Sequence, residues 1–180
     1  MRIKQILVIL SLFAIMLAAL PGTNSLAATD VPAVHGGYAR YRRRLLEDGV
    51  ELHEVKHLGP GQTPNRLSRR ILGSSGVSLH SKAMVVDGAE GFVGSFNLDP
   101  RSAALNTEMG VAVRHPGFAA AIAGEHARLA APAAAWRVTL EGGRLAWRDG
   151  AAWHATEPGA SRLRRATAFM AWLLPVEGQL

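Results

Sequence analysis

The chain has 180 residues, of which 48% are hydrophobic, enough for one domain with a small appendage. It contains no cysteine, which excludes a disulfide framework, a thiolate metal site and a cysteine nucleophile. The formal net charge is +6, and arginines are clustered at residues 40–44, 66–70 and 162–165. Such clusters suit phosphate in nucleic acid or in anionic lipid headgroups, but they also occur on ordinary solvated surfaces, so charge alone does not identify the partner.

The amino terminus has the layout of a signal peptide. Residues 1–4 form a short basic start, residues 5–20 are almost entirely apolar, and Pro21-Gly22 interrupts the run. Ser25 and Ala27 then place small residues at the −3 and −1 positions of a cleavage site. The run is shorter than the roughly 20 residues of a comfortable membrane span. A signal peptide is therefore the first interpretation, an uncleaved membrane anchor the second and a buried strand the third.

Helical and β-like segments alternate after this leader. Asp30 as cap and Pro32 in the first turn predict a helix that ends near Gly49. Residues 50–55 alternate polar and apolar side chains and predict a strand. Residues 57–70 combine glycine, proline and arginine, which predicts a basic loop.

The carboxy-terminal half continues in the same way. We predict a strand over 107–113, an alanine-rich helix over 116–129 and a hairpin over 136–147, turning at Glu141-Gly142-Gly143. Residues 161–174 predict a terminal helix with arginines first and large apolar residues after them. This helix either docks on the core, which is the commoner arrangement, or lies on a bilayer.

Residues 79–97, LHSKAMVVDGAEGFVGSFN, predict an antiparallel hairpin of two apolar strands, 79–87 and 90–97. Gly88 fits the first central position of a two-residue turn that requires positive φ. This turn predicts a register in which His80 faces Asn97 and Lys82 faces Ser95.

Four polar side chains share one face of the sheet in this register, because directly opposed residues and residues two apart lie on the same side. His80, Lys82, Ser95 and Asn97 would then converge within apolar strands. Such burial is costly unless the groups bond one another or a ligand. The alternative to a ligand site is a small polar network that satisfies itself.

The convergent set suits phosphoryl transfer without a metal or other cofactor. Lys82 supplies positive charge, while the hydroxyl of Ser95 and the amide of Asn97 donate to phosphate oxygens. The imidazole of His80 is a competent nucleophile on phosphorus near neutral pH.

Two carboxylates complete the predicted site. Glu108 begins the next β-like run and is the candidate that holds the second nitrogen of the imidazole and selects its tautomer. Asp87 lies at the hairpin turn, too far along the strand to touch phosphate, and is expected to brace the hairpin through backbone and side-chain hydrogen bonds.

The pattern His80-x-Lys82-x4-Asp87, followed by Gly94-Ser95-x-Asn97, resembles the HKD signature of the phospholipase D superfamily. The segments 23–35, 97–108 and 173–180 also resemble bacterial cardiolipin-synthase-like members, so the resemblance covers roughly residues 23–180. It implies an α/β fold, a phospholipase D-like half-domain with a mixed β-sheet flanked by helices.

The resemblance implies a two-step phosphodiester transfer on phospholipid. One histidine forms a phosphohistidine intermediate and a second protonates the leaving alcohol, after which water or another lipid hydroxyl resolves the intermediate. His80 would take one of these roles, with Lys82, Ser95 and Asn97 around the phosphate and Glu108 behind the imidazole. Such an enzyme would work at a membrane surface, exported to or associated with the periplasmic side of a bacterial inner membrane.

The chain departs from the family in having one motif where the lipid enzymes carry two. Residues 28–180 therefore resemble the carboxy-terminal half of a two-motif protein, with 1–27 as leader where relatives have domain interior. A homodimer would supply the second histidine, whereas a truncated product would be inactive. Single-motif relatives include nucleases, so nucleic acid is the second substrate hypothesis. The histidines that lack a lysine two residues on are His35, His53, His57, His115, His126 and His154.

Overall fold

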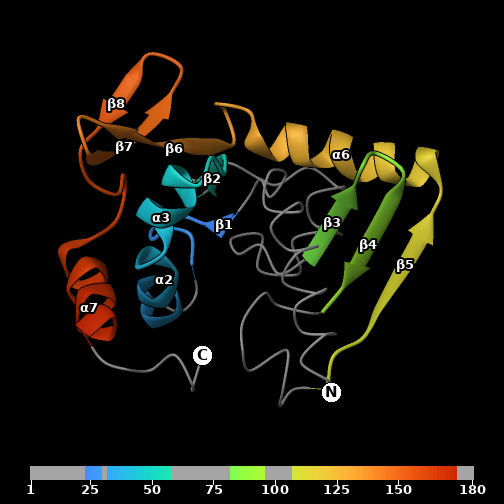
Figure 1. Cartoon of the computed structure of the whole chain (residues 1–180). Helices are drawn as coiled ribbons and strands as arrows, with labels where there is room; N and C mark the ends of the chain where they lie inside the picture. The colour runs from blue at the N-terminus through green and yellow to red at the C-terminus, as the bar shows by residue number, and fades with distance from the viewer. Residues whose placement is uncertain (1–22, 30–31, 58–81, 96–106, 174–180) are drawn as a thin grey trace.

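The computed structural model describes residues 23–29, 32–57, 82–95 and 107–173, and the chain is an α/β protein with a mixed sheet and flanking helices, as predicted (Figure 1). The helices are α2 (Pro32–Ala39), α3 (Arg42–Glu47), α6 (Pro116–Ala130) and α7 (Arg162–Leu173). The strands are β1 (Thr23–Asn24), β2 (Leu52–Val55), β3 (Lys82–Val86), β4 (Glu90–Gly94), β5 (Gly110–Arg114), β6 (Ala135–Glu141), β7 (Arg144–Asp149) and β8 (Ala152–His154).

The described strands form two sheets. One sheet has the order β1-β2-β6-β7-β8 and is mixed, because β1 is parallel to β2 while the other pairs are antiparallel. The other sheet is antiparallel, with the order β3-β4-β5. Helix α6 contacts strands of both sheets, whereas α2, α3 and α7 gather beside the mixed sheet (Figure 1).

The mixed sheet contains the main apolar core. Val50, Leu52, Val138 and Trp147 are buried together, and α3 packs two leucines against them. The predicted hairpin is confirmed as β6 and β7, which are joined by two glycines with φ of 55° and 75°. Those positive φ values are the ones that a tight hairpin turn requires, which is why the Gly-Gly pair specifies the turn locally.

The single helix predicted before Gly49 is wrong, because the structure has two helices there. After Ala39 the backbone hydrogen bonds change from an α-helical to a turn pattern. The Arg40 N–H donates to the Gly37 carbonyl and the Tyr41 N–H to the Tyr38 carbonyl, each three residues back. This interruption lets Arg42 point into the core, where it is 2% exposed. The predicted end is correct, since Gly49 adopts φ of 85° after α3.

Residues 23–27, assigned to the leader, contribute to the fold. Strand β1 pairs with β2, the Ser25 N–H donates to the Val55 carbonyl, and Leu26 is 1% exposed. Residues 1–22 lie outside the described part, so a signal peptide or anchor remains a prediction. None of the helices in the described ranges is both long and apolar enough to cross a membrane.

The terminal helix α7 docks on α2, as the commoner of the two predicted arrangements requires. Its buried residues are Ala168 and Ala171, and α2 meets this small-residue face with Gly36. A Cβ at Gly36 would lie 2.4 Å from the Ala168 carbonyl oxygen. The two backbones therefore approach as closely as glycine allows.

Candidate functional site

The predicted hairpin is confirmed, but its register is wrong by one residue. Strands β3 and β4 pair so that Lys82 lies opposite Gly94 and Val86 opposite Glu90. The turn has positive φ at both Asp87 (52°) and Gly88 (65°), and the Ala89 N–H donates to the Val86 carbonyl at 3.0 Å. Asp87 and Gly88 are therefore the central residues of the turn, whereas the predicted turn was centred on Gly88 and Ala89. Three residues thus lie between the strands where the prediction had two.

The slip removes the geometric argument for convergence of four side chains. A shift of one residue moves a strand's side chains to the opposite face. Lys82 therefore does not face Ser95 directly, because Gly94 occupies that position. The second predicted pair, His80 and Asn97, lies outside the described residues, so its facing remains untested.

The structure nevertheless joins two predicted site residues that lie 13 positions apart. The Ser95 hydroxyl donates to the Glu108 Oε2 at 2.6 Å. Ser95 also makes two hydrogen bonds with the backbone of Met109. Its N–H donates to the Met109 carbonyl at 2.9 Å, and its Oγ accepts from the Met109 N–H at 3.1 Å. Glu108 was predicted to hold the His80 imidazole, and this stays a prediction because His80 lies outside the described residues; among the described residues, Glu108 accepts from the serine.

Lys82 is the first residue of β3 and lies opposite Gly94, the residue before Ser95. Side chains two apart share a face, so Lys82 lies on the side of Gly94 and Phe92, whereas Gly91 lies on the side that α6 covers with Phe118 and Ile122. The Phe92 ring fills the space above Gly94, where a Cβ would be 2.7 Å from Cζ. Lys82 is half-buried and forms no ion pair with another described residue. Its side chain therefore lies on the face of the hairpin away from α6.

Asp87 is at the other end of the hairpin from Ser95. It is five residues from Lys82, which corresponds to about 16 Å along an extended strand. Its side chain is exposed, and the part of the chain that the structure describes offers it no hydrogen-bond partner. The hydrogen bond across the turn joins Ala89 to Val86, and no bond of Asp87 itself is seen among the described residues, so the predicted bracing by Asp87 stays a prediction. What the structure shows of Asp87 is its left-handed backbone conformation.

A buried charged cluster, which sequence reasoning missed, lies beneath α2 and α3. Arg42 Nε is 2.9 Å from Glu54 Oε1, and its Nη1 donates to Glu157 Oε1 at 2.8 Å. Its Nη2 also contacts His35 Nε2, and the Trp147 indole N–H donates to Glu54 at 2.9 Å. Glu54 is 0% exposed.

Burial sets the protonation of this cluster. Desolvation, with the nearby Arg42 charge, lowers the pKa of His35 to about 3, so the imidazole is neutral. The His35 Nδ1–H donates to the Asn24 carbonyl at 3.2 Å, and Nε2 faces the guanidinium. Burial raises the pKa of Glu54, while the hydrogen bond from Arg42 lowers that of Glu157 against its own burial. Arg42 thus belongs to an internal network and not to a surface that binds phosphate, a distinction that no local sequence signal carries.

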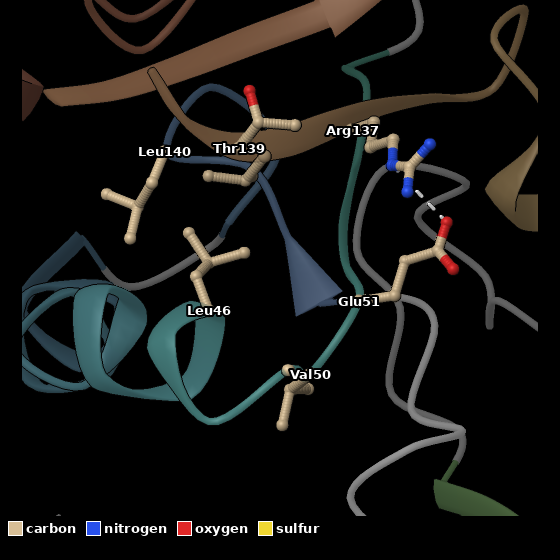
Figure 2. A pocket seen from close by; sticks show the side chains of 8 residues that line it. Leu46, Val50, Glu51, Arg137, Thr139 and Leu140 are labelled. Carbon is tan, nitrogen blue, oxygen red and sulfur yellow. Dashed lines mark ion pairs between the residues drawn. The ribbon is translucent and has the colours of Figure 1, made fainter. Parts of the chain in front are cut away.

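A shallow hollow of about 320 Å³ lies between α3, the segment that leads from α3 to β2, and β6 (Figure 2). Its wall includes Leu46, Val50, Thr139 and Leu140, and an ion pair of 3.4 Å joins Glu51 and Arg137 at its rim. None of the predicted site residues lines it. Among the described residues, no group of three or more His, Asp or Glu side chains is placed to hold a metal.

Comparison with known proteins identifies the family. Residues 19–130 match the family described as "Cardiolipin synthase, PLD-like domain", a range that includes His80, Lys82, Ser95, Asn97 and Glu108. The chain is 44% identical over 163 residues to cardiolipin synthase C of Escherichia coli strain K12, which covers 86% of this chain and 33% of that protein.

Two further relatives are from Helicobacter pylori and are named only as uncharacterized proteins. The one from strain J99 is 36% identical over 142 residues, which covers 76% of this chain and 25% of the relative. The one from strain 26695 is 40% identical over 99 residues, or 54% of this chain and 18% of the relative. This chain thus spans about a third or less of the length of these relatives, and no solved structure matches it. The chain belongs to the cardiolipin synthase, PLD-like domain family of the phospholipase D superfamily.

Proposed function

We propose that this chain provides a phospholipase D-type catalytic half-site that hydrolyses or transfers phosphodiesters of phospholipids. The observation that carries the proposal is the family match over residues 19–130, which contains the His80-x-Lys82 motif and both partners of the Ser95–Glu108 hydrogen bond. The similarity to cardiolipin synthase C favours phospholipid as substrate.

In the proposed reaction, a ring nitrogen of His80 attacks phosphorus and the bond from phosphorus to the leaving alcohol oxygen breaks. A second imidazole gives its proton to that alcohol. Water or another lipid's hydroxyl then attacks the phosphohistidine, the P–N bond breaks, and the second imidazole takes the proton of the attacking hydroxyl. Lys82 and Asn97 would stabilise the charge that develops on the non-bridging oxygens.

The Ser95–Glu108 bond has a consequence for this reaction. A hydroxyl has one proton, and of the two acceptors beside Ser95 Oγ, Glu108 Oε2 is the nearer, at 2.6 Å against 3.3 Å for the Met109 carbonyl. Before Ser95 can donate to phosphate, its hydroxyl must rotate away from the carboxylate. The Glu108 carboxylate has two oxygens, so it can accept the N–H of the His80 imidazole whether or not Ser95 is bonded to it.

The second imidazole requires a second motif, because this chain contains one His-x-Lys pair. A symmetric homodimer would bring two copies of His80 to one site across a two-fold axis. Apolar side chains beside Ser95 support an interface there: Met109 is 82% exposed and Val111 is 61% exposed. We propose such an assembly at the periplasmic side of a bacterial inner membrane, with the leader directing it there.

Nucleic acid is the second candidate substrate, favoured by the single motif and the arginine content. The structure weakens the charge argument, because Arg42 is buried and Arg164 donates to the carbonyls of Leu26 and Thr29. An inactive fragment is the third candidate, and it predicts a monomer without turnover.

The test is to assay the purified chain on phosphatidylglycerol vesicles, plasmid DNA and bis(p-nitrophenyl) phosphate. His80→Ala should abolish turnover and Lys82→Ala should reduce it by about two to three orders of magnitude. The matched control is His57→Ala, which removes an exposed imidazole without a lysine two residues on. Cleavage of DNA without cleavage of lipid would refute the lipid proposal, and an inert monomer would refute catalysis by the chain alone.

A further inference from the structure

The solvent face of α7 is apolar, the reverse of an ordinary surface helix. Its buried face is made of small residues, Ala168 and Ala171, whereas the large side chains point outward. The exposed fractions are 57% for Phe169, 57% for Met170 and 53% for Leu173. A surface helix normally places such residues against the core and polar residues outward, so this face is arranged for contact with another apolar phase.

Helix periodicity places the exposed residues on a single stripe. Positions 162, 166, 169, 170 and 173 follow the spacing i, i+4, i+7, i+8 and i+11, which lines one side of an α-helix. Trp172 extends the stripe, because its ring stacks on that of Phe169 with centroids 5.9 Å apart and planes at 15°. Leu163 adds a further exposed apolar side chain, at 77%, near the start of the helix.

The charge of the stripe is entirely positive. Helix α7 contains three arginines and no acidic residue. Arg162 is exposed at the amino-terminal end of the stripe, while Arg164 and Arg165 are engaged with backbone carbonyls of neighbouring segments. At the other end, the Arg40 guanidinium donates to the carbonyl of Trp172. This contact satisfies a terminal carbonyl of the helix and places a second cationic group beside the aromatic pair.

From these observations we propose that α7 docks the protein on the surface of an anionic lipid bilayer, with the stripe of Phe169, Met170, Trp172 and Leu173 in the acyl boundary and Arg162 among the headgroups. The helix has 12 residues, about 18 Å, which is too short to span a hydrocarbon core of about 30 Å, so it lies in the interface plane. Because α2 already holds the helix, its backbone need not be ordered on binding.

Charge favours this occupant over a second copy of the chain. A two-fold contact through the stripe would place arginine-bearing helices together with no acidic side chain on α7 to pair with them. Anionic headgroups supply the complementary charge, and an arginine near such a surface contributes about 1 kcal/mol. Binding of this kind does not require the chain to be catalytic.

The experiment is cosedimentation of the full chain with vesicles of phosphatidylcholine alone and of phosphatidylcholine with phosphatidylglycerol, with His80→Ala included to exclude turnover. We expect binding to the anionic vesicles that weakens at high salt. Phe169→Ser/Leu173→Ser should reduce the partition coefficient by at least about tenfold, and the milder Met170→Ser by about threefold to tenfold. Arg162→Gln should reduce it by about fivefold at low salt.

The matched control is Trp153→Ser, which removes a 50% exposed aromatic side chain from β8, on a different part of the surface. It should bind anionic vesicles as the unmodified chain does. Circular dichroism of each variant establishes that the fold is retained. Absence of binding to anionic vesicles, equal binding by folded stripe variants, or a dimer that these variants dissociate without change in vesicle binding would each overturn the proposal.

Discussion

Replacing His35 with glutamine should remove a pH dependence of folding that the buried imidazole confers. In the folded state the ring is 4% exposed, donates from Nδ1 to the Asn24 carbonyl and faces the Arg42 guanidinium with Nε2. A proton on Nε2 would point at a cation and would lack solvation. Glutamine retains one donor and one acceptor but does not titrate.

The magnitude follows from proton linkage. The pKa of His35 is lowered from 6.5 to about 3 on folding, chiefly by burial and secondly by Arg42, so below pH 6.5 the unfolded chain binds a proton that the folded chain excludes. The contribution of the neutral His35 to the free energy of unfolding is fully present above pH 6.5, the pKa of the histidine in the unfolded chain. It is lost as pH falls from 6.5 toward 3. Between pH 7.5 and pH 5 the loss is about 2 kcal/mol.

The assay is urea unfolding of the unmodified chain and of His35→Gln at pH 7.5, 6, 5 and 4, compared at each pH. Glu54 and Glu157 face the same cluster and titrate in both proteins, so the difference between the two curves isolates the histidine. The difference in unfolding free energy should shrink as pH falls, by about 2 kcal/mol at pH 5. Parallel curves over this range would show that the imidazole is protonated in the folded state, which would refute the reasoning.

Three further substitutions test the packing. Arg42→Met should lower the free energy of unfolding by about 3–5 kcal/mol at pH 7.5, because Glu54 is left buried without its cation. The loss should be smaller at pH 5, where Glu54 can take up a proton, and an equal loss at both pH values in urea titrations would contradict this. Asp87→Val should lower the free energy of unfolding by about 1–2 kcal/mol, because the φ of 52° at this position is strained for a β-branched residue, while Asp87→Asn should change it by no more than about 0.5 kcal/mol. Equal stability of the two variants would show that the left-handed backbone at Asp87 does not matter for the turn. Gly36→Val should lower the thermal midpoint, with a cost of about 1–3 kcal/mol, because its Cβ would lie 2.4 Å from a backbone oxygen of α7, whereas Gly124→Ala, with open space around it, is the control that should not destabilise.

Local signals in the sequence predicted most of the carboxy-terminal elements well. The helix predicted at 116–129 is α6 at Pro116–Ala130, and the terminal helix predicted at 161–174 is α7 at Arg162–Leu173. The hairpin predicted at 136–147 is β6 and β7. In each case the periodicity of apolar residues and the turn residues act over a few positions, so short stretches suffice to specify the element.

The candidate site was predicted only in part. The sequence motif identified the family and selected Lys82, Ser95 and Glu108, and the structure places Ser95 on Glu108 at 2.6 Å. The predicted register failed because the turn centred on Asp87-Gly88 leaves Ala89 as an extra residue. One residue in a turn is a small local difference, yet it changes which side chains share a face along the whole hairpin.

The amino-acid sequence by itself determined the family, the principal strands and helices and the choice of candidate site residues, because these depend on residue type and spacing over short distances. Only the tertiary structure decided that Arg42 is internal, that Thr23 and Asn24 form part of the sheet and that α7 turns its small residues inward and its large apolar residues outward. Each of these outcomes depends on partners far away in the chain, such as Glu157 for Arg42 and Gly36 for Ala168. The free energy of burying a charge or an apolar surface is set by those partners, and they become neighbours only when the chain folds.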